Sequence, residues 1–199
     1  METPFSAAGM LHPLLAKRYS PRAFENRAIE PEKLARIFEA ARWSASCNNE
    51  QPWRFIVGQK GEGDTFERIL GVLTENNQRW TKNAPVLMIV CSASLFSANG
   101  KPNKWHLYDA GQAAVHLTIQ ALHEGIYVHQ MAGFDPQKAI EAFSIPSDII
   151  PASAIAMGYL GDIASLPEDL QKREHQPRSR KPLNEMVFSG AWGNTSNFI

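Results

Sequence analysis

The pattern of hydrophobic and polar positions changes its period several times along this chain. Residues 28–43 carry an apolar stripe at helical spacing, and Pro31 suits the first turn, so we predict a helix there. The same reasoning predicts further helices over 66–73 and 136–143 and a short strand over 53–58. Polar segments that contain Ser, Asn, Gly or Pro separate these elements and are expected to form loops.

Two continuous apolar runs, residues 85–94 and 151–161, are typical of strands that are buried on both faces. Between them, residues 110–124 form a predicted helix that is apolar nearly all round, with Asp109 as its cap and Gly125 as its stop. Such a helix is expected to be buried, and a second subunit could cover part of it. Because strands and helices alternate, the fold class is α/β or α+β.

The composition fits a single domain with no net charge. The chain has 199 residues, 44% of them hydrophobic, and no linker divides it, so we expect a single domain over 1–199. Its 20 basic and 20 acidic residues cancel, which gives no overall attraction to nucleic acid or to an acidic membrane. The longest apolar run, residues 85–91, is too short to span a bilayer. The two cysteines, Cys47 and Cys91, cannot form a disulfide framework and fit a reducing cytoplasm.

Two basic clusters lie near opposite ends of the chain. Residues 17–22 read Lys-Arg-Tyr-Ser-Pro-Arg, and residues 178–181 read Arg-Ser-Arg-Lys. Guanidinium groups together with a hydroxyl are what a phosphate monoester binds to, through paired and charge-assisted hydrogen bonds. Taken singly, either cluster is more often a solvated charged patch, so both interpretations stay open at this point.

Sequence motifs of several other site classes are missing. The chain contains no P-loop motif, no Gly-x-Gly-x-x-Gly fingerprint, no Cys-x-x-Cys, no His-Glu-x-x-His and no Gly-x-Ser-x-Gly elbow. His116 and His123 are seven residues apart on the predicted helix, but no third ligand stands at a suitable spacing. Packing or hydrogen bonding is therefore favoured for both histidines, and we expect no metal site.

Five segments in order along the chain resemble the nitroreductase family. They are KRYSPRAF with the helix and the SASCNNEQPWRFIV stretch that follow it, NNQRW before APVLMIV, YDAGQAA, MAGFD, and RSRKPL. Each motif is weak alone, whereas five in the family's order across residues 18–183 form a specific pattern. The resemblance implies a nitroreductase-like α+β fold, an α/β sandwich with a central mixed sheet flanked by helices, in an intertwined homodimer.

The resemblance also implies an FMN site at the dimer interface. The basic segments would meet on one phosphate, although Arg22 could instead reach the pyrimidine edge. Residues 45–49 match the loop that the family contributes from the other subunit, Asn77 matches a contact to the ring or ribityl chain, and Ala132 and Gly133 match backbone donors near the flavin N5. The implied cofactor residues are Arg18, Tyr19, Ser20, Arg22, Ala45, Ser46, Cys47, Asn49, Asn77, Ala132, Gly133, Arg178 and Arg180.

The chain departs from the family pattern in the loop. Ala45 stands where the family commonly has Pro, and Cys47 stands at a neighbouring position that is commonly Ser. Both side chains are small, so ring packing should survive, and a packing role for Cys47 is favoured over a redox-active thiol. Residues 96–106 correspond to the family's variable region and are expected to form a mobile loop. They resemble no subfamily closely enough to name a substrate.

The function that the resemblance implies is an FMN-dependent oxidoreductase. It would pass electrons from NAD(P)H to a small organic acceptor such as a nitroaromatic or a quinone, in a ping-pong scheme through one site. Because the flavin carries the chemistry, we name no catalytic side chain. Two alternatives remain, an oxidase, dehalogenase or flavin-fragmenting enzyme of the same fold, and a flavin-binding module without turnover. We expect a cytoplasmic homodimer with no nucleic-acid or membrane partner.

Overall fold

One antiparallel sheet forms the middle layer of the protein. The computed structural model describes residues 11–199, so the first ten residues of the expected 1–199 domain lie outside the described part. The strands are β1 (Trp53–Gln59), β2 (Val86–Ala93), β3 (Tyr127–Met131) and β4 (Ile149–Gly158). They pair in the order β1-β2-β4-β3, and each neighbouring pair is antiparallel.

The expectation of a mixed sheet is therefore wrong for these four strands. β2 and β3 do run in the same direction, joined by the long helix α5 (His106–His123), as in a βαβ unit. However, β4 lies between them, so the two parallel strands are not neighbours. The alternation of elements along a sequence shows which strands a helix connects, but it does not show which strands lie side by side.

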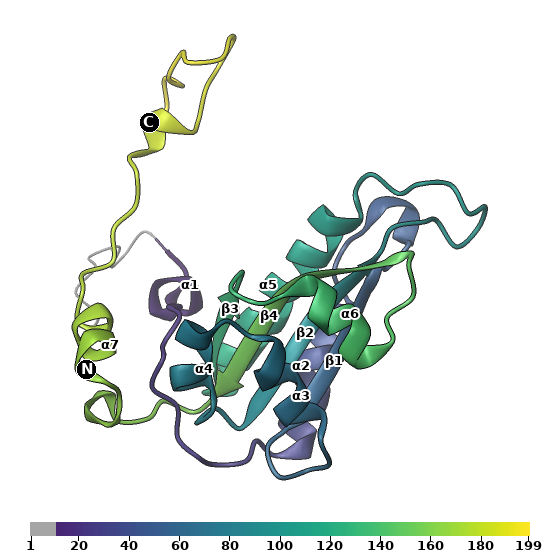
Figure 1. Ribbon diagram of the computed structural model, residues 1–199. Coiled ribbons are helices and arrows are strands. Elements are labelled where there is room, and N and C mark those ends of the chain that lie inside the picture. The colour runs from purple at the N-terminus through teal and green to yellow at the C-terminus, as the bar shows by residue number, and fades with distance from the viewer. Residues whose placement is uncertain (1–10) are drawn as a thin grey trace.

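Helices cover both faces of the sheet (Figure 1). α2 and α5 pack on one face, and α3 and α6 pack on the other. The remaining bounds are α1 (Pro13–Lys17), α2 (Pro31–Arg42), α3 (Thr65–Val72), α4 (Glu75–Thr81), α6 (Pro136–Phe143) and α7 (Glu168–Glu174). The predicted helices are confirmed to within a few residues, whereas α1, α4 and α7 were not predicted, because five to seven residues are too few to show a helical period. Among residues 11–199, no helix is long and apolar enough to cross a membrane.

Strand β2 separates two hydrophobic cores. Leu87 and Ile89 pack into the core under α3, and Val86 and Met88 pack into the core under α2 and α5. Each of these side chains is at most 1% exposed, which explains why the strand reads as a continuous apolar run. Cys91 is confirmed as a core residue, and its burial raises the pKa of the thiol to about 11.

Helix α5 is buried on one side only by the described chain. Ala113 and Leu117 face the sheet and are fully buried, whereas Tyr108 and Val115 remain 68% and 51% exposed. The expectation of burial nearly all round is thus not met by residues 11–199 of one chain. The helix also begins at His106, so Asp109 lies within the first turn and does not cap it. Its side chain has a different partner, described below.

After α7 the chain leaves the body of the protein as an extended arm (Figure 1). Phe188 and Trp192 pack against each other near its end, with ring centroids 5.0 Å apart. Trp192 is nevertheless 91% exposed, and Phe198 is 79% exposed. The end of the arm therefore presents large apolar side chains to the solvent.

Candidate functional site

The two basic segments lie side by side, although 160 residues separate Arg18 from Arg178. The Arg178 guanidinium donates to the carbonyl oxygen of Arg18 at 2.6 Å and to that of Ala16 at 3.0 Å. These bonds fix the chain after α7 to the end of α1. A hollow of about 150 Å³ opens there, lined by Leu11, Leu15, Ala16, Arg18, Arg178 and Arg180. The structure thus brings the two segments together as expected, while their contact with a phosphate stays a prediction.

The charges around this hollow repel one another. Burial lowers the pKa of Arg18, and the neighbouring Arg180 and Arg178 lower it further. The hydroxyl of Ser20 accepts a hydrogen bond from the Arg18 guanidinium at 3.3 Å, which adds a polar group of no charge. Like charges held this close are unfavourable until an anion enters, and forked donors suit the oxygens of a phosphate. The residues present therefore fit the phosphate group of a flavin mononucleotide.

Arg22 and Tyr19 are engaged beside this hollow and do not line it. Arg22 forms an ion pair with Glu174 at 2.9 Å, and the Glu174 side chain is only 3% exposed. The Tyr19 ring packs edge-on against Tyr127, with centroids 5.3 Å apart. Burial, followed by the charge of Glu174, raises the pKa of Tyr19 to about 12, so the phenol is neutral at physiological pH. A role of Arg22 at the pyrimidine edge remains a prediction.

His129 on β3 forms a hydrogen bond to the first basic segment, residues 17–22, and sequence reasoning missed this contact. Its Nδ1 donates to the carbonyl oxygen of Pro21 at 2.8 Å, and its ring lies 4.5 Å from the indole of Trp80. Burial, assisted by the charges of Arg22 and Arg18, lowers the pKa of His129 to about 4. The imidazole is therefore neutral near pH 7. The sequence gives no signal for this contact, because the partners are 108 residues apart.

A second part of the site joins α4 to the turn after β3. The side-chain amide of Asn77 donates to the carbonyl oxygen of Gly133 at 2.9 Å, and the Thr74 N–H donates to the same oxygen at 3.0 Å. A Cβ atom at position 133 would lie 2.5 Å from the Asn77 Nδ2, so only glycine allows this close approach. The structure thus places Asn77 beside the turn of Ala132 and Gly133, and their contact with a flavin stays a prediction.

The loop between α2 and β1 has an unusual backbone. We call residues 45–51 the cofactor loop. Asn48, Asn49 and Gln51 have φ angles of 52°, 56° and 52°, in the left-handed region that residues other than glycine seldom adopt. Ser46 stabilises the loop from within, because its hydroxyl oxygen accepts a hydrogen bond from the Gln51 N–H at 2.9 Å. The predicted loop is confirmed, but its strained conformation could not be foreseen.

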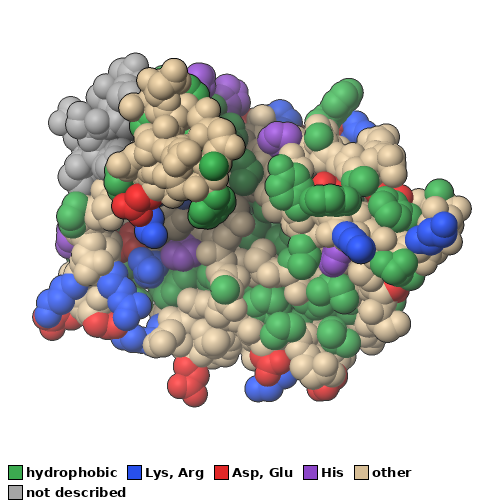
Figure 2. Space-filling view, turned by 90° about the horizontal axis from the view of Figure 1, so that it is seen from above, with side chains coloured by type: hydrophobic (Ala, Val, Ile, Leu, Met, Phe, Trp, Pro, Cys, Tyr) green, Lys and Arg blue, Asp and Glu red, His purple; other side chains and the backbone are tan. Residues whose placement is uncertain are grey.

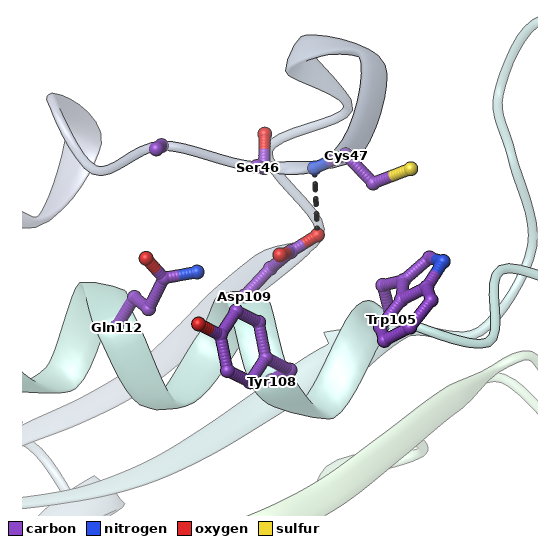
Figure 3. Close-up of a pocket in the computed structure, with 7 residues that line it drawn as sticks. Ser46, Cys47, Trp105, Tyr108, Asp109 and Gln112 are labelled. Carbon is purple, nitrogen blue, oxygen red and sulfur yellow. Dashed lines mark hydrogen bonds between the residues drawn. The ribbon is translucent and has the colours of Figure 1, made fainter. Parts of the chain in front are cut away.

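A pocket of about 280 Å³ opens between the cofactor loop and the start of α5 (Figure 3). The Cys47 side chain points along it toward the Trp105 end (Figure 3). The ring of Trp105 is 58% exposed and forms one of its flat apolar walls. Its lining consists of Ala45, Ser46, Cys47, Trp105, Tyr108, Asp109 and Gln112. This set shares no residue with the basic hollow, so one chain presents the expected site as two separate parts.

Comparison with known proteins identifies the family. The model of the nitroreductase family matches residues 15–76. A Methanothermobacter thermautotrophicus protein, named as a candidate NADH dehydrogenase/NAD(P)H nitroreductase, is 31% identical over 146 residues, which cover 71% of this chain and 73% of that protein. The chain belongs to the nitroreductase family. An uncharacterised Mycolicibacterium smegmatis protein is 34% identical over 148 residues, 71% of this chain and 98% of its own. A solved structure described as an oxidoreductase containing FMN superposes with a TM-score of 0.87 at 36% identity, covering 93% of this chain and 94% of the other.

As a member of the nitroreductase family, the protein is an oxidoreductase with the nitroreductase-like fold. Sequence reasoning missed His129, Glu174 and the hydrogen bond that Asp109 accepts from the Cys47 N–H at 3.0 Å in place of capping its helix. For Asp109 a signal did exist, since it lies four residues before Ala113 on the buried stripe of a helix. An acidic residue on such a stripe indicates a buried polar contact rather than a solvated end. Among residues 11–199, no group of three His, Cys, Asp or Glu side chains is arranged to hold a metal ion.

Proposed function

We propose that this protein binds FMN and uses it to pass electrons from NAD(P)H to a small organic acceptor such as a nitroaromatic or a quinone. The observation that carries the proposal is the convergence of Arg18, Arg178 and Arg180 around one hollow. FMN ends in a phosphate monoester, which suits such a cluster. The name of the Methanothermobacter relative supports NAD(P)H as the reductant, and the neighbour of 36% identity supports FMN.

In this proposal the side chains bind and orient, and the bound flavin supplies the capacity to accept and return a hydride. Arg18, Arg178 and Arg180 would hold the phosphate. Asn77, already fixed to Gly133, would present its remaining amide oxygen to the ring or the ribityl chain. The pocket beside the cofactor loop offers flat apolar walls for a nicotinamide or for an aromatic acceptor. If the nicotinamide and the acceptor bind to this one pocket in turn, the reaction would follow a ping-pong scheme.

We also propose a homodimer, because one chain leaves the site in two parts. Figure 2 shows hydrophobic side chains gathered on the surface beside the projecting arm. Tyr108 and Val115 on α5 and Trp192 on the arm are all more than half exposed, and a large apolar interface would bury them. The cofactor loop of one subunit would then reach the basic hollow of the other. Reduction by NAD(P)H also fits a cytoplasmic location, where the free Cys47 and Cys91 stay reduced.

Flavin identification and turnover test the proposed chemistry. We expect acid treatment of the purified protein to release FMN, and we expect steady-state NAD(P)H oxidation to accelerate with a nitroaromatic or a quinone. Recovery of FAD, or no flavin uptake on reconstitution, would refute the cofactor assignment. Bound FMN with oxygen as the sole acceptor would favour an oxidase, and bound FMN without any oxidation of NAD(P)H would favour a binding module.

Mixed dimers test the cross-subunit site. A dimer of one Arg18→Ala chain and one Asn49→Ala chain would carry one intact site and one doubly damaged site if the loops cross over. If each loop served the flavin of its own chain, every site would carry one lesion. We therefore expect about half of the sites in the mixed dimer to bind FMN with normal affinity. A monomer in sedimentation, or a mixed dimer without normal sites, would contradict the arrangement.

A further inference from the structure

The cofactor loop adopts a conformation that its own sequence does not favour. Three of its residues, Asn48, Asn49 and Gln51, have left-handed φ angles within four positions, and none of them is glycine. Asn tolerates this region better than most residues, whereas Gln gains no such advantage. A backbone of this kind persists only where surrounding contacts determine it, and such strain is concentrated at functional sites. The contacts that hold the loop are therefore part of the site.

Among these contacts, one comes from a buried side chain of a distant element. The N–H of Cys47 donates to the Oδ2 atom of Asp109 at 3.0 Å, across 62 residues of sequence (Figure 3). Asp109 is only 3% exposed. Asp109 lies inside the first turn of α5 and does not cap the helix, and its carboxylate points out of the helix toward the loop (Figure 3). Because this bond is partly buried, its loss should have a larger effect than the loss of a hydrogen bond at the surface.

We propose that Asp109 is a positioning residue that holds the cofactor loop in the conformation required for flavin binding. This inference rests on the proposed function, since it takes the loop to contact FMN. Asp109 lies on α5 between Tyr108 and Gln112, which line the same pocket as Cys47. Its bond to the Cys47 N–H thus sets the spacing between the loop and the helix. When the acceptor oxygen is lost, the loop relaxes toward ordinary backbone conformations and both the flavin contact and the pocket change.

Two substitutions separate the hydrogen bond from the volume of the side chain. Asp109→Leu keeps a side chain of similar length and removes the acceptor, whereas Asp109→Asn keeps an oxygen that can accept from the Cys47 N–H. A matched control lies farther along the same helix. Thr118 is 5% exposed, and its hydroxyl donates to the Ala114 carbonyl oxygen at 2.7 Å. The same hydroxyl accepts from the Gln130 side-chain amide at 3.3 Å, so Thr118→Val removes both hydrogen bonds of this side chain without touching the loop.

The first measurement uses flavin-free protein, so that it does not depend on the proposed function. We expect amide hydrogen exchange at residues 46–51 to accelerate at least about tenfold in Asp109→Leu and to stay near the native rate in Asp109→Asn and Thr118→Val. Equal protection of the loop in Asp109→Leu and in the native protein would overturn the proposal. If Asp109→Leu does not fold, the native protein still decides, because a Cys47 amide that exchanges as fast as the exposed neighbouring amides would show that Asp109 does not hold it.

The second measurement is FMN affinity, followed by quenching of flavin fluorescence. We expect affinity to fall about tenfold in Asp109→Leu and to recover in Asp109→Asn, with no change in Thr118→Val. The same loss in both Asp109 variants would overturn the role of the hydrogen bond. If the native protein binds no FMN, the proposed function fails, and the exchange experiment still reports whether Asp109 fixes the loop.

Discussion

Removal of one guanidinium group from the basic hollow should weaken FMN binding without destabilising the flavin-free protein. In the flavin-free protein, Arg18 is partly buried next to Arg178 and Arg180, and the mutual repulsion contributes to the lowered pKa of Arg18. Removing one of these charges relieves that repulsion. We therefore expect Arg180→Ala to leave the unfolding free energy of flavin-free protein unchanged or slightly higher, while FMN affinity falls.

The size of the affinity loss follows from the contact that a phosphate would make. A charge-assisted hydrogen bond contributes roughly 1.5–3 kcal/mol, which corresponds to about 10- to 150-fold in the dissociation constant. Arg18 is half-buried and should lie toward the upper end of this range, because the surrounding protein excludes solvent. Arg180 is exposed and also donates to the Ser179 carbonyl oxygen, so solvent screening should place it near the lower end.

A double-mutant cycle decides whether both arginines contact one anion. FMN would be titrated into the flavin-free native, Arg18→Ala, Arg180→Ala and doubly substituted proteins at low salt, with thermal unfolding followed in parallel. The double substitution should lose less affinity than the sum of the single losses, because both residues contact one group. Arg173→Ala removes an exposed charge on α7 away from the hollow and serves as the control. Full additivity, unchanged affinity, or an equal fall in Arg173→Ala would refute a shared phosphate site.

Three further predictions concern single residues. Burial lowers the pKa of His129 to about 4, so the unfolded chain binds more protons than the folded chain between about pH 6.5 and pH 4. The free energy of unfolding should therefore fall as the pH drops through this window, by about 2 kcal/mol from pH 7 to pH 5. Urea denaturation should show this slope in the native protein and a smaller slope in His129→Asn; identical slopes would contradict the assignment. Gly133→Ala should displace the Asn77 amide, because the new Cβ would lie 2.5 Å from it. We expect FMN affinity to fall while the melting temperature changes little, and an unchanged affinity would show that this turn does not contact the flavin. Cys47→Ser keeps the backbone N–H and a small side chain, so FMN affinity and turnover should stay within about twofold of native, whereas a large loss of turnover with normal binding would indicate a redox role of the thiol.

The sequence by itself determined the local elements and the family. The helical stripe of α2 and the continuous apolar run of β2 depend on neighbouring residues only, so both could be predicted and both are confirmed. The order of five short motifs was enough to recognise the nitroreductase family, because the order of segments is a property of the chain alone. The short helices α1, α4 and α7 were missed for a local reason as well, since they are shorter than the pattern that reveals a helix.

The tertiary structure alone decided which distant groups meet. In the structure β4 lies between β2 and β3, and Arg22 forms an ion pair with Glu174. The Asp109 carboxylate accepts a hydrogen bond from the loop and does not cap its own helix. A hydrogen bond or an ion pair depends on the path of the backbone through space, which side-chain chemistry at one position does not specify. Candidate residues could therefore be named from the sequence, whereas the groups that they contact follow only from the tertiary structure. The contact between Asp109 on α5 and the backbone of the cofactor loop is one such case.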